Sequence, residues 1–246
     1  MKKKLIAALC TLAVSVGLLS GCSQGAESDA GRETSAQEET AGGAAEENTQ
    51  KEEVVVTMPA TSEPESGFDP AFGWGAGEHV HEPLIQSTLT VTTQDLQMDK
   101  DLSTDYSVSE DGMTWTVTIR DDVKFTDGEP LTARDVAFTY NNCKEKSSVN
   151  DFTMLEEAVA VDDTTVEFHM TRPYSIWPYT IAIVGIVPEH AYDENYGQNP
   201  IGSGRYIMKQ WDKGQQVIFE ENPDYYGEEP KIKKLTVLFM EEDAAL

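Results

Sequence analysis

Apolar and polar residues alternate most regularly between Met113 and Arg120, where Trp115, Val117 and Ile119 are separated by threonines. A period of two is typical of a strand with one buried face. We therefore predict a strand here, with the three apolar side chains directed into a core.

Turn and helix signals surround this strand. Glu110-Asp111-Gly112 precedes it and Asp127-Gly128 follows it; both predict turns, because glycine adopts the positive φ that a tight turn needs. Thr132 as N-cap and Asp135 at N3 then indicate a capping box at the start of a helix. Further along, Val136, Ala137, Tyr140 and Cys143 fall on one helical face.

The same patterns predict further strands. Val54–Met58 is a short apolar run typical of a buried strand, and Ile181–Val187 is a core segment too short to span a membrane. Two hairpins and a final strand follow from alternation and turn residues: Ala158–Met170 around Asp162-Asp163, Tyr206–Trp211 with Gln216–Glu220, and Lys234–Met240. Strands mixed with helices predict a mixed α/β fold.

The first 21 residues have the pattern of a targeting segment. Lysines 2–4 precede an apolar run, and Leu19-Ser20-Gly21-Cys22 resembles a lipobox. We predict a lipoprotein signal peptide at 1–21 and lipid attachment at Cys22; an ordinary secretory peptide is the alternative. The mature chain would then lie outside the cytoplasm, at the cell surface or in the periplasm, held to the membrane by lipid alone.

Residues 23–53 contain no aromatic and no large aliphatic side chain. Such a composition cannot bury enough apolar surface to fold. We therefore predict a disordered acidic tether at 22–53 and a folded domain at 54–246.

Net charge and cysteine content limit the classes of function that the chain can have. The chain carries 44 acidic and 18 basic residues, a net charge of −26; loss of the three signal-peptide lysines leaves 15 basic residues and −29. Nucleic-acid phosphates would be repelled by this charge, so no nucleic-acid partner is expected. Because Cys10 lies in the signal peptide and Cys22 is the anchor, Cys143 alone remains, and we expect it to be a small core residue.

The central stretch carries a family resemblance. Its matching positions are Asp111, Gly112, Arg120, Phe125, Asp127, Gly128, Thr132, Ala133, Asp135 and Val136. Later segments add Gly202, Gly204 and Tyr206, with Ser203 and Arg205 departing from the usual pattern, and Asn222-Pro-Asp-Tyr-Tyr-Gly227. Together they resemble the family 5 extracellular solute-binding proteins, the peptide and nickel receptors of ABC importers.

The resemblance implies an architecture. Members of this family have a periplasmic-binding-protein-like fold of type II, in which two α/β lobes close on a ligand. Residues 54–246 are expected to form lobe one. Because family members continue into a second lobe, we expect that lobe to be missing here, as in a fragment or a truncated gene product.

The resemblance also implies a ligand-binding wall. The segment Ser62–Thr90 resembles a family loop that lines the ligand cleft and leads into a helix. On that basis the predicted cleft residues are Phe68, Phe72, Trp74 and His79, together with Tyr174 and Trp177. A cap over the end of the sheet is the alternative role for the aromatic residues.

His79 and His81 invite a metal interpretation. Residues at i and i+2 share a face on a strand, but they diverge on a helix, where each residue turns by about 100°. The resemblance places this segment at a helix start, so we predict no metal site and no cofactor.

The sequence leaves two ligand classes open. The first is a lipoprotein receptor that delivers oligopeptides or dipeptides to ABC permease subunits; the alternative cargo is a nickel chelate or another small solute, with His79 or His81 contributing. A secreted hydrolase is disfavoured, since neither G-x-S-x-G nor H-E-x-x-H occurs and the remaining cysteine is predicted to be helical. We therefore predict a binding protein and not an enzyme.

Overall fold

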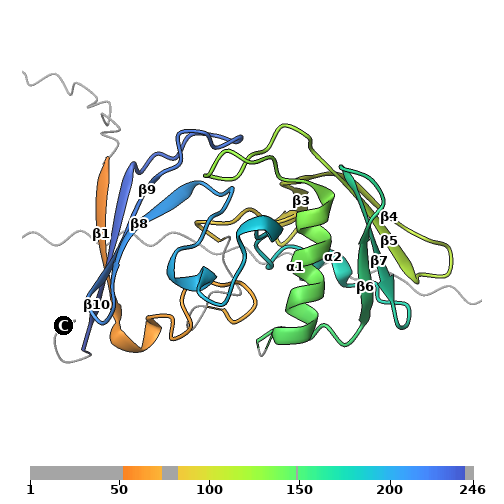
Figure 1. The fold of residues 1–246 in the computed structure, drawn as a ribbon, viewed down its shortest axis with the longest axis horizontal. Coiled ribbons are helices and arrows are strands. Elements are labelled where there is room, and N and C mark those ends of the chain that lie inside the picture. Colours follow the sequence, from red (N-terminus) through yellow and green to blue (C-terminus); the bar gives the residue numbers. More distant parts are fainter. Residues whose placement is uncertain (1–51, 74–82, 148, 242–246) are drawn as a thin grey trace, which may run out of the picture. The chain divides into compact units, whose positions relative to one another are not determined.

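The computed structural model describes residues 52–73, 83–147 and 149–241. Among them, two four-stranded sheets and one long helix form the framework (Figure 1). The signal peptide, most of the tether, Trp74 and His79 lie outside the described residues.

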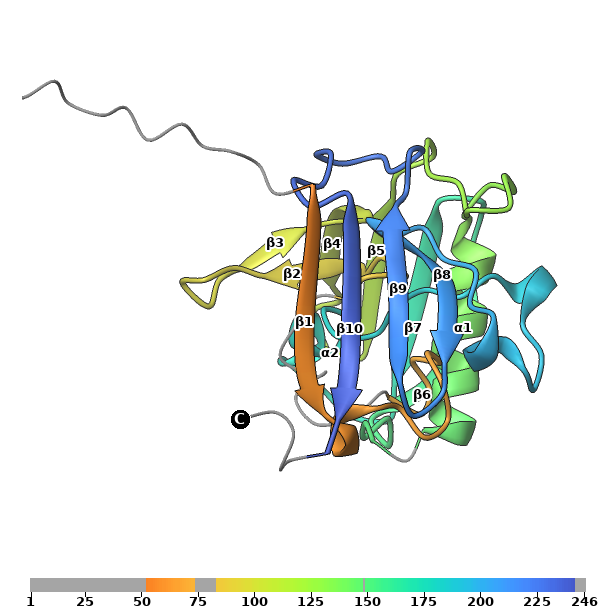
Figure 2. The ribbon, with the colours of Figure 1, turned by 90° about the vertical axis from the view of Figure 1, so that its left-hand side faces the viewer.

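The first sheet has the strand order β1-β10-β9-β8. It comprises β1 (Glu53–Pro59), β10 (Lys234–Met240), β9 (Gln216–Glu221) and β8 (Tyr206–Asp212). β1 and β10 are parallel, with Val56 opposite Val237, whereas β8, β9 and β10 are antiparallel neighbours (Figure 2). The predicted hairpin of β8 and β9 and the final strand are confirmed.

The second sheet has the order β4-β5-β7-β6 and is antiparallel throughout. It comprises β4 (Ser103–Val108), β5 (Thr114–Ile119), β7 (Thr165–Met170) and β6 (Leu155–Ala160). Trp115, Val117 and Ile119 on β5 are buried, as their alternation predicts. A separate two-stranded ribbon joins β2 (Thr90–Thr92) to β3 (Met98–Lys100).

The helix α1 (Ala133–Lys146) packs on the second sheet and lies on the side that faces the first sheet (Figure 1). Its capping box is present: the Thr132 amide donates to Asp135 Oδ2 at 2.9 Å. Val136, Ala137, Tyr140 and Cys143 are buried, which confirms the predicted apolar face. Shorter helical segments are α2 (Trp177–Thr180) and the 3₁₀ turns at Ala60–Ser62, Glu189–Ala191 and Tyr196–Gln198.

Two apolar cores result. The larger lies between the second sheet, α1 and the segment from Trp177 to Ile186; the smaller contains Phe68, Tyr206, Phe219 and Phe239 against the first sheet. β1 departs from prediction. It is the edge strand of the described sheet, and Val55 is 57% exposed. An edge strand has a neighbour on one side only, so an apolar run alone does not establish burial.

Candidate functional site

The loop that follows β1 starts at the edge of the first sheet where the parallel strands β1 and β10 both end. Carboxyl ends of parallel strands are a common place for ligands in α/β proteins. Glu63 fixes the loop to the β8–β9 hairpin, because its carboxylate accepts from Trp211 Nε1 at 2.8 Å and from the Gly214 amide at 2.7 Å.

Asp69 shapes the next part of this loop. The Ala71 amide donates to its Oδ1 at 2.9 Å, and the Phe72 and Gly73 amides donate to its backbone carbonyl. Tyr192 Oη donates to Oδ2 at 2.7 Å. Burial raises the pKa of the Asp69 carboxyl, while these hydrogen bonds oppose the rise. The turn at 69–73 is therefore held by both the carboxyl group and the backbone carbonyl of Asp69.

The segment from Leu84 to Gln86 lies opposite the loop that follows β1. It is bound to the chain entering β8: the Gly204 amide donates to Ile85 O at 2.7 Å, and the Tyr206 amide donates to Leu84 O at 3.0 Å. A Cβ at Gly202 would lie 2.0 Å from Ile85 O. Close backbone approach is what excludes a side chain at Gly202 and Gly204, since neither glycine has a positive φ.

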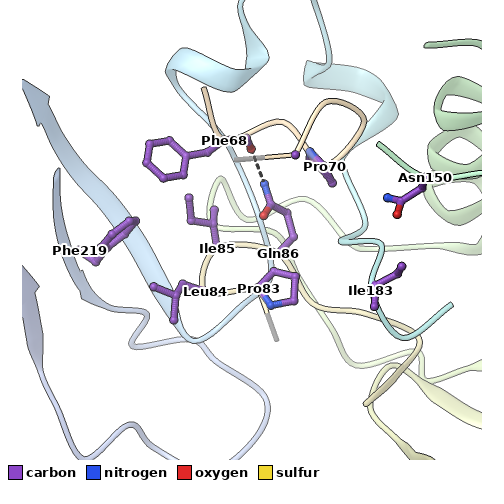
Figure 3. Close-up of a pocket in the computed structure, with 10 residues that line it drawn as sticks. Phe68, Pro70, Pro83, Leu84, Ile85, Gln86, Asn150, Ile183 and Phe219 are labelled. Carbon is purple, nitrogen blue, oxygen red and sulfur yellow. Dashed lines mark hydrogen bonds between the residues drawn. The ribbon is translucent and has the colours of Figure 1, made fainter. Parts of the chain in front are cut away.

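Between these segments is a cavity of about 40 Å³ (Figure 3). Its lining comes from the loop after β1, the 83–86 segment, the chain after α1, the core segment after α2, and β9. The lining residues are Phe68, Pro70, Gly73, Pro83, Leu84, Ile85, Gln86, Asn150, Ile183 and Phe219. Apolar side chains dominate, with two side-chain amides among them, which is the usual composition of a small-molecule site.

Gln86 is the buried polar residue of this wall. Its Nε2 donates to Phe68 O and to Tyr196 Oη, both at 3.1 Å (the first is the dashed line in Figure 3). A Cβ at Gly185 would lie 2.5 Å from Gln86 Cβ, so the glycine makes room for it. Gln86 thereby connects the loop after β1 to the Tyr196 segment.

Of the predicted cleft residues, Phe68 lines the cavity. Its ring packs edge-on against Trp211 and Phe219, at centroid distances of 5.2 and 5.8 Å, so it also belongs to the smaller core. Phe72 is 38% exposed and lies on the Asp69 turn, outside the lining. Trp74 and His79 lie outside the described residues. No helix begins in the residues described directly after them, 83–89.

The other two predicted residues lie elsewhere. Trp177 is 1% exposed and packs against Tyr140 and Phe168, so the structure contradicts its placement on a cleft wall. Tyr174 is partly buried against the same core, and its carbonyl accepts from Trp115 Nε1 at 3.2 Å. An aromatic, proline-punctuated segment is compatible with either a core or a binding site, and here packing uses it.

The family-motif residues are mainly structural. Gly112 and Gly128 have φ of 71° and 93° in turns, and Asp111 Oδ1 accepts from the Met113 amide. Asp127 contacts His190 at 2.8 Å. Arg120 forms an ion pair with Asp122. Phe125, Ala133 and Val136 are buried, and Tyr206 Oη donates to Ile232 O. These contacts position the framework around the cavity and contribute none of its lining.

Sequence reasoning missed most of the lining, including Gln86, Asn150, Ile183 and Phe219. Gln86 and Tyr196 are 110 positions apart, and neither lies in a pattern that indicates proximity. An uncharged glutamine beside an apolar run is a weak signal that could have drawn attention to Gln86.

In the described part of the chain, no cluster of three or more His, Cys, Asp or Glu side chains has the geometry of a metal site. None of its helices combines the length and apolarity that a membrane crossing requires.

Comparison with known proteins gives a consistent picture. Residues 97–246 match the family model of the bacterial extracellular solute-binding proteins, family 5 (middle region). The chain is 30% identical over 184 residues to a probable D,D-dipeptide-binding periplasmic protein of Escherichia coli, an alignment that covers 70% of this chain and 36% of that protein. The chain thus spans about a third of the length of such curated relatives.

Solved structures share the fold. NikZ of Campylobacter jejuni in complex with Ni(L-His) superposes with a TM-score of 0.69 at 25% identity, over 77% of this chain and 39% of that one. The oligopeptide-binding protein AppA of Bacillus subtilis, in complex with a nonapeptide, gives 0.67 at 26% identity, over 79% and 42%. The expected periplasmic-binding-protein-like α/β fold is confirmed.

Proposed function

The chain belongs to the bacterial extracellular solute-binding proteins of family 5, and on that premise we propose that it binds peptides outside the cytoplasm for delivery to the permease subunits of an ABC importer. Residues 54–246 are proposed to form lobe one, with the cavity beside Phe68 and Gln86 as part of its ligand wall. Binding leaves the peptide chemically unchanged.

The observation that carries this proposal is the composition and place of the cavity. It lies at the junction of the two cores, beside the loop that leaves the carboxyl ends of β1 and β10. Its described lining contains apolar side chains and two amides, and no imidazole, thiolate or carboxylate. A mainly apolar lining with a few polar groups suits an organic ligand.

Titration of the purified full chain with di- to nonapeptides and, separately, with the Ni(II)–histidine complex tests the proposal. We expect saturable peptide binding by calorimetry and recovery of the intact peptide by mass spectrometry. Saturable binding of the nickel complex alone would identify a nickel chelate as the ligand in place of a peptide, with residues such as His79 or His81 contributing to the site. Binding of neither would reject a solute-binding role for this chain.

We further propose that the signal peptide spans 1–21, that 22–53 is a tether, and that Cys22 carries lipid. Expression of the full chain in bacteria fed labelled palmitate should give a labelled, membrane-associated protein. Cys22→Ser should lose both the label and the membrane association. Equal labelling of both proteins would contradict the anchor.

A further inference from the structure

The orientation of the Gln86 side-chain amide is fixed by its neighbours. The Phe68 carbonyl can only accept a hydrogen bond, so the atom 3.1 Å from it must be the amide nitrogen. Tyr196 gives its single hydroxyl proton to Ile201 O at 2.7 Å, so its oxygen accepts from the same nitrogen. Both amide protons of Gln86 are thereby used, and Oε1 remains as an acceptor.

Gln86 Oε1 has no hydrogen-bond donor among the described residues, although the residue is 5% exposed and lines the cavity. A carbonyl oxygen that accepts no hydrogen bond from the described residues can accept one from a ligand N–H. The side chain of Asn150, which also lines the cavity, makes no hydrogen bond within the described chain either. Two side-chain amides in an otherwise apolar wall can therefore form hydrogen bonds with a ligand.

The volume of the cavity and the absence of charge in its described lining limit which ligand groups can enter it. A water-sized group needs roughly 10–15 Å³ of this kind of volume, so the cavity of about 40 Å³ takes a group of about three non-hydrogen atoms. None of the described lining residues is charged, so a carboxylate or ammonium group placed there would lose its hydration without a partner. A branched apolar side chain such as that of valine fits both limits.

We propose that this cavity is a subsite for a small, uncharged, apolar residue of a bound peptide, and that Gln86 Oε1 accepts a hydrogen bond from the peptide N–H beside that residue. This rests on the proposed peptide-binding function and adds to it a residue preference and a specificity-determining side chain. Asn150 is placed to contact the same peptide segment.

A ligand-side deletion tests the hydrogen bond without disturbing the fold. The probes are Ala-Val-Ala, its analogue with an ester oxygen in place of the valine N–H, and Ala-Glu-Ala. Each is titrated into the ¹⁵N-labelled full chain at millimolar concentrations, and Kd is obtained from amide chemical shifts. We expect the ester analogue to bind about tenfold more weakly than the peptide and Ala-Glu-Ala to bind more weakly than both.

The protein-side variant is Gln86→Met, which keeps the side-chain length and removes the acceptor together with the two hydrogen bonds that Nε2 donates. In this variant the peptide and the ester should bind equally, a double-mutant cycle that assigns the difference to Gln86. Gln215→Met, an exposed glutamine in the β8–β9 turn, should keep the tenfold ratio. If Gln86→Met does not fold, shifts of the Gln86 side-chain NH₂ and Ile85 amide signals of the native chain, seen with peptide and reduced with ester, replace it.

The outcomes separate the two proposals. Peptide binding with equal affinity for the ester analogue, or a tenfold ratio that persists in Gln86→Met, overturns the role of Gln86 and leaves peptide binding intact. Tighter binding of Ala-Glu-Ala overturns the preference for an uncharged residue. Absence of saturable binding by every peptide overturns the proposed function and this subsite with it.

Discussion

Single residues determine how closely the segments around the cavity approach. Gly202 and Gly204 let the backbone at Ile85 come into hydrogen-bonding contact, and Gly185 leaves room for Gln86. Gln86 and Asp69 then hold the loop after β1 by hydrogen bonds from two sides. The cavity wall therefore depends on small residues and on buried polar side chains as much as on its apolar lining.

Gly202→Ala should destabilise the folded chain by about 3 kcal/mol, because its Cβ would lie 2.0 Å from Ile85 O and one backbone must move. The matched control is Gly214→Ala. Gly214 has φ of 79° and nothing within 4 Å of its Cβ position, so only about 1–2 kcal/mol of conformational strain is expected. Urea denaturation measures both; equal losses would show that close approach at Gly202 is not limiting.

Asp69 predicts a pH dependence. Burial raises its folded-state pKa above the ordinary 3.8. Its contribution to stability is thus fully present below pH 3.8 and is lost as the pH rises through the folded-state pKa. Relative to Asp69→Asn, which has no such titration, the native chain's free energy of unfolding should fall over that interval and then level off. Urea denaturation of both proteins from pH 3.5 to 7 measures this difference; an opposite slope would contradict it.

Residue roles were predictable where they depend on neighbours in sequence. Asp111 and Gly112 in their turn, Gly128, and the pair Thr132 and Asp135 act within five positions of themselves, so turn and cap chemistry identifies them. The partners of Gln86 lie 18 and 110 positions away. Such contacts follow from the tertiary arrangement, which leaves no periodic signal around a single glutamine.

At the scale of elements, the start of α1 is also a tertiary anchor. The Asp135 carboxylate accepts from the Thr132 amide at 2.9 Å, and through Oδ1 from the Glu189 amide at 3.0 Å. One buried side chain thus caps the helix and attaches the 3₁₀ turn at Glu189–Ala191. This explains an acidic residue on an otherwise apolar face.

Asp135→Ala should cost about 2–3 kcal/mol, because it removes the cap and leaves two amides without their acceptor. Asp135→Asn keeps a side-chain carbonyl oxygen and should lose less. Thermal and urea unfolding measure stability, and hydrogen exchange at Glu189 should accelerate in the alanine variant. An unchanged Glu189 exchange rate would contradict the anchoring role.

Hairpins and the capped helix were predictable because their partners are adjacent in sequence. The pairing of β1 with β10 joins residues about 180 positions apart, as for Val56 and Val237. No local pattern specifies such a pairing. The prediction that β1 is buried was wrong for the same reason. Burial depends on which elements cover a strand, and the apolar run of β1 contains no information about that.

At the scale of the whole described structure, the two sheets are linked by a group of polar contacts as well as at the cavity. Tyr226, from the loop between β9 and β10, donates through Oη to Asp101 Oδ1 at 2.6 Å. Arg120, which directly follows β5, lies 4.4 Å above the Tyr226 ring and pairs with Asp122. Two family-motif segments therefore meet here, and their contact links one sheet to the other.

Because the cavity lining and Tyr226 connect the two cores at separate points, both sheets should unfold as one cooperative unit. Hydrogen exchange of the slowest amides in β9 and β5 should then report the same free energy of opening. Tyr226→Phe, which removes the hydrogen bond to Asp101 and keeps the ring under Arg120, should lower both values equally, by about 1–2 kcal/mol. A loss confined to one sheet, or different values in the native chain, would show that each core unfolds independently and that the cavity lies across a mobile junction.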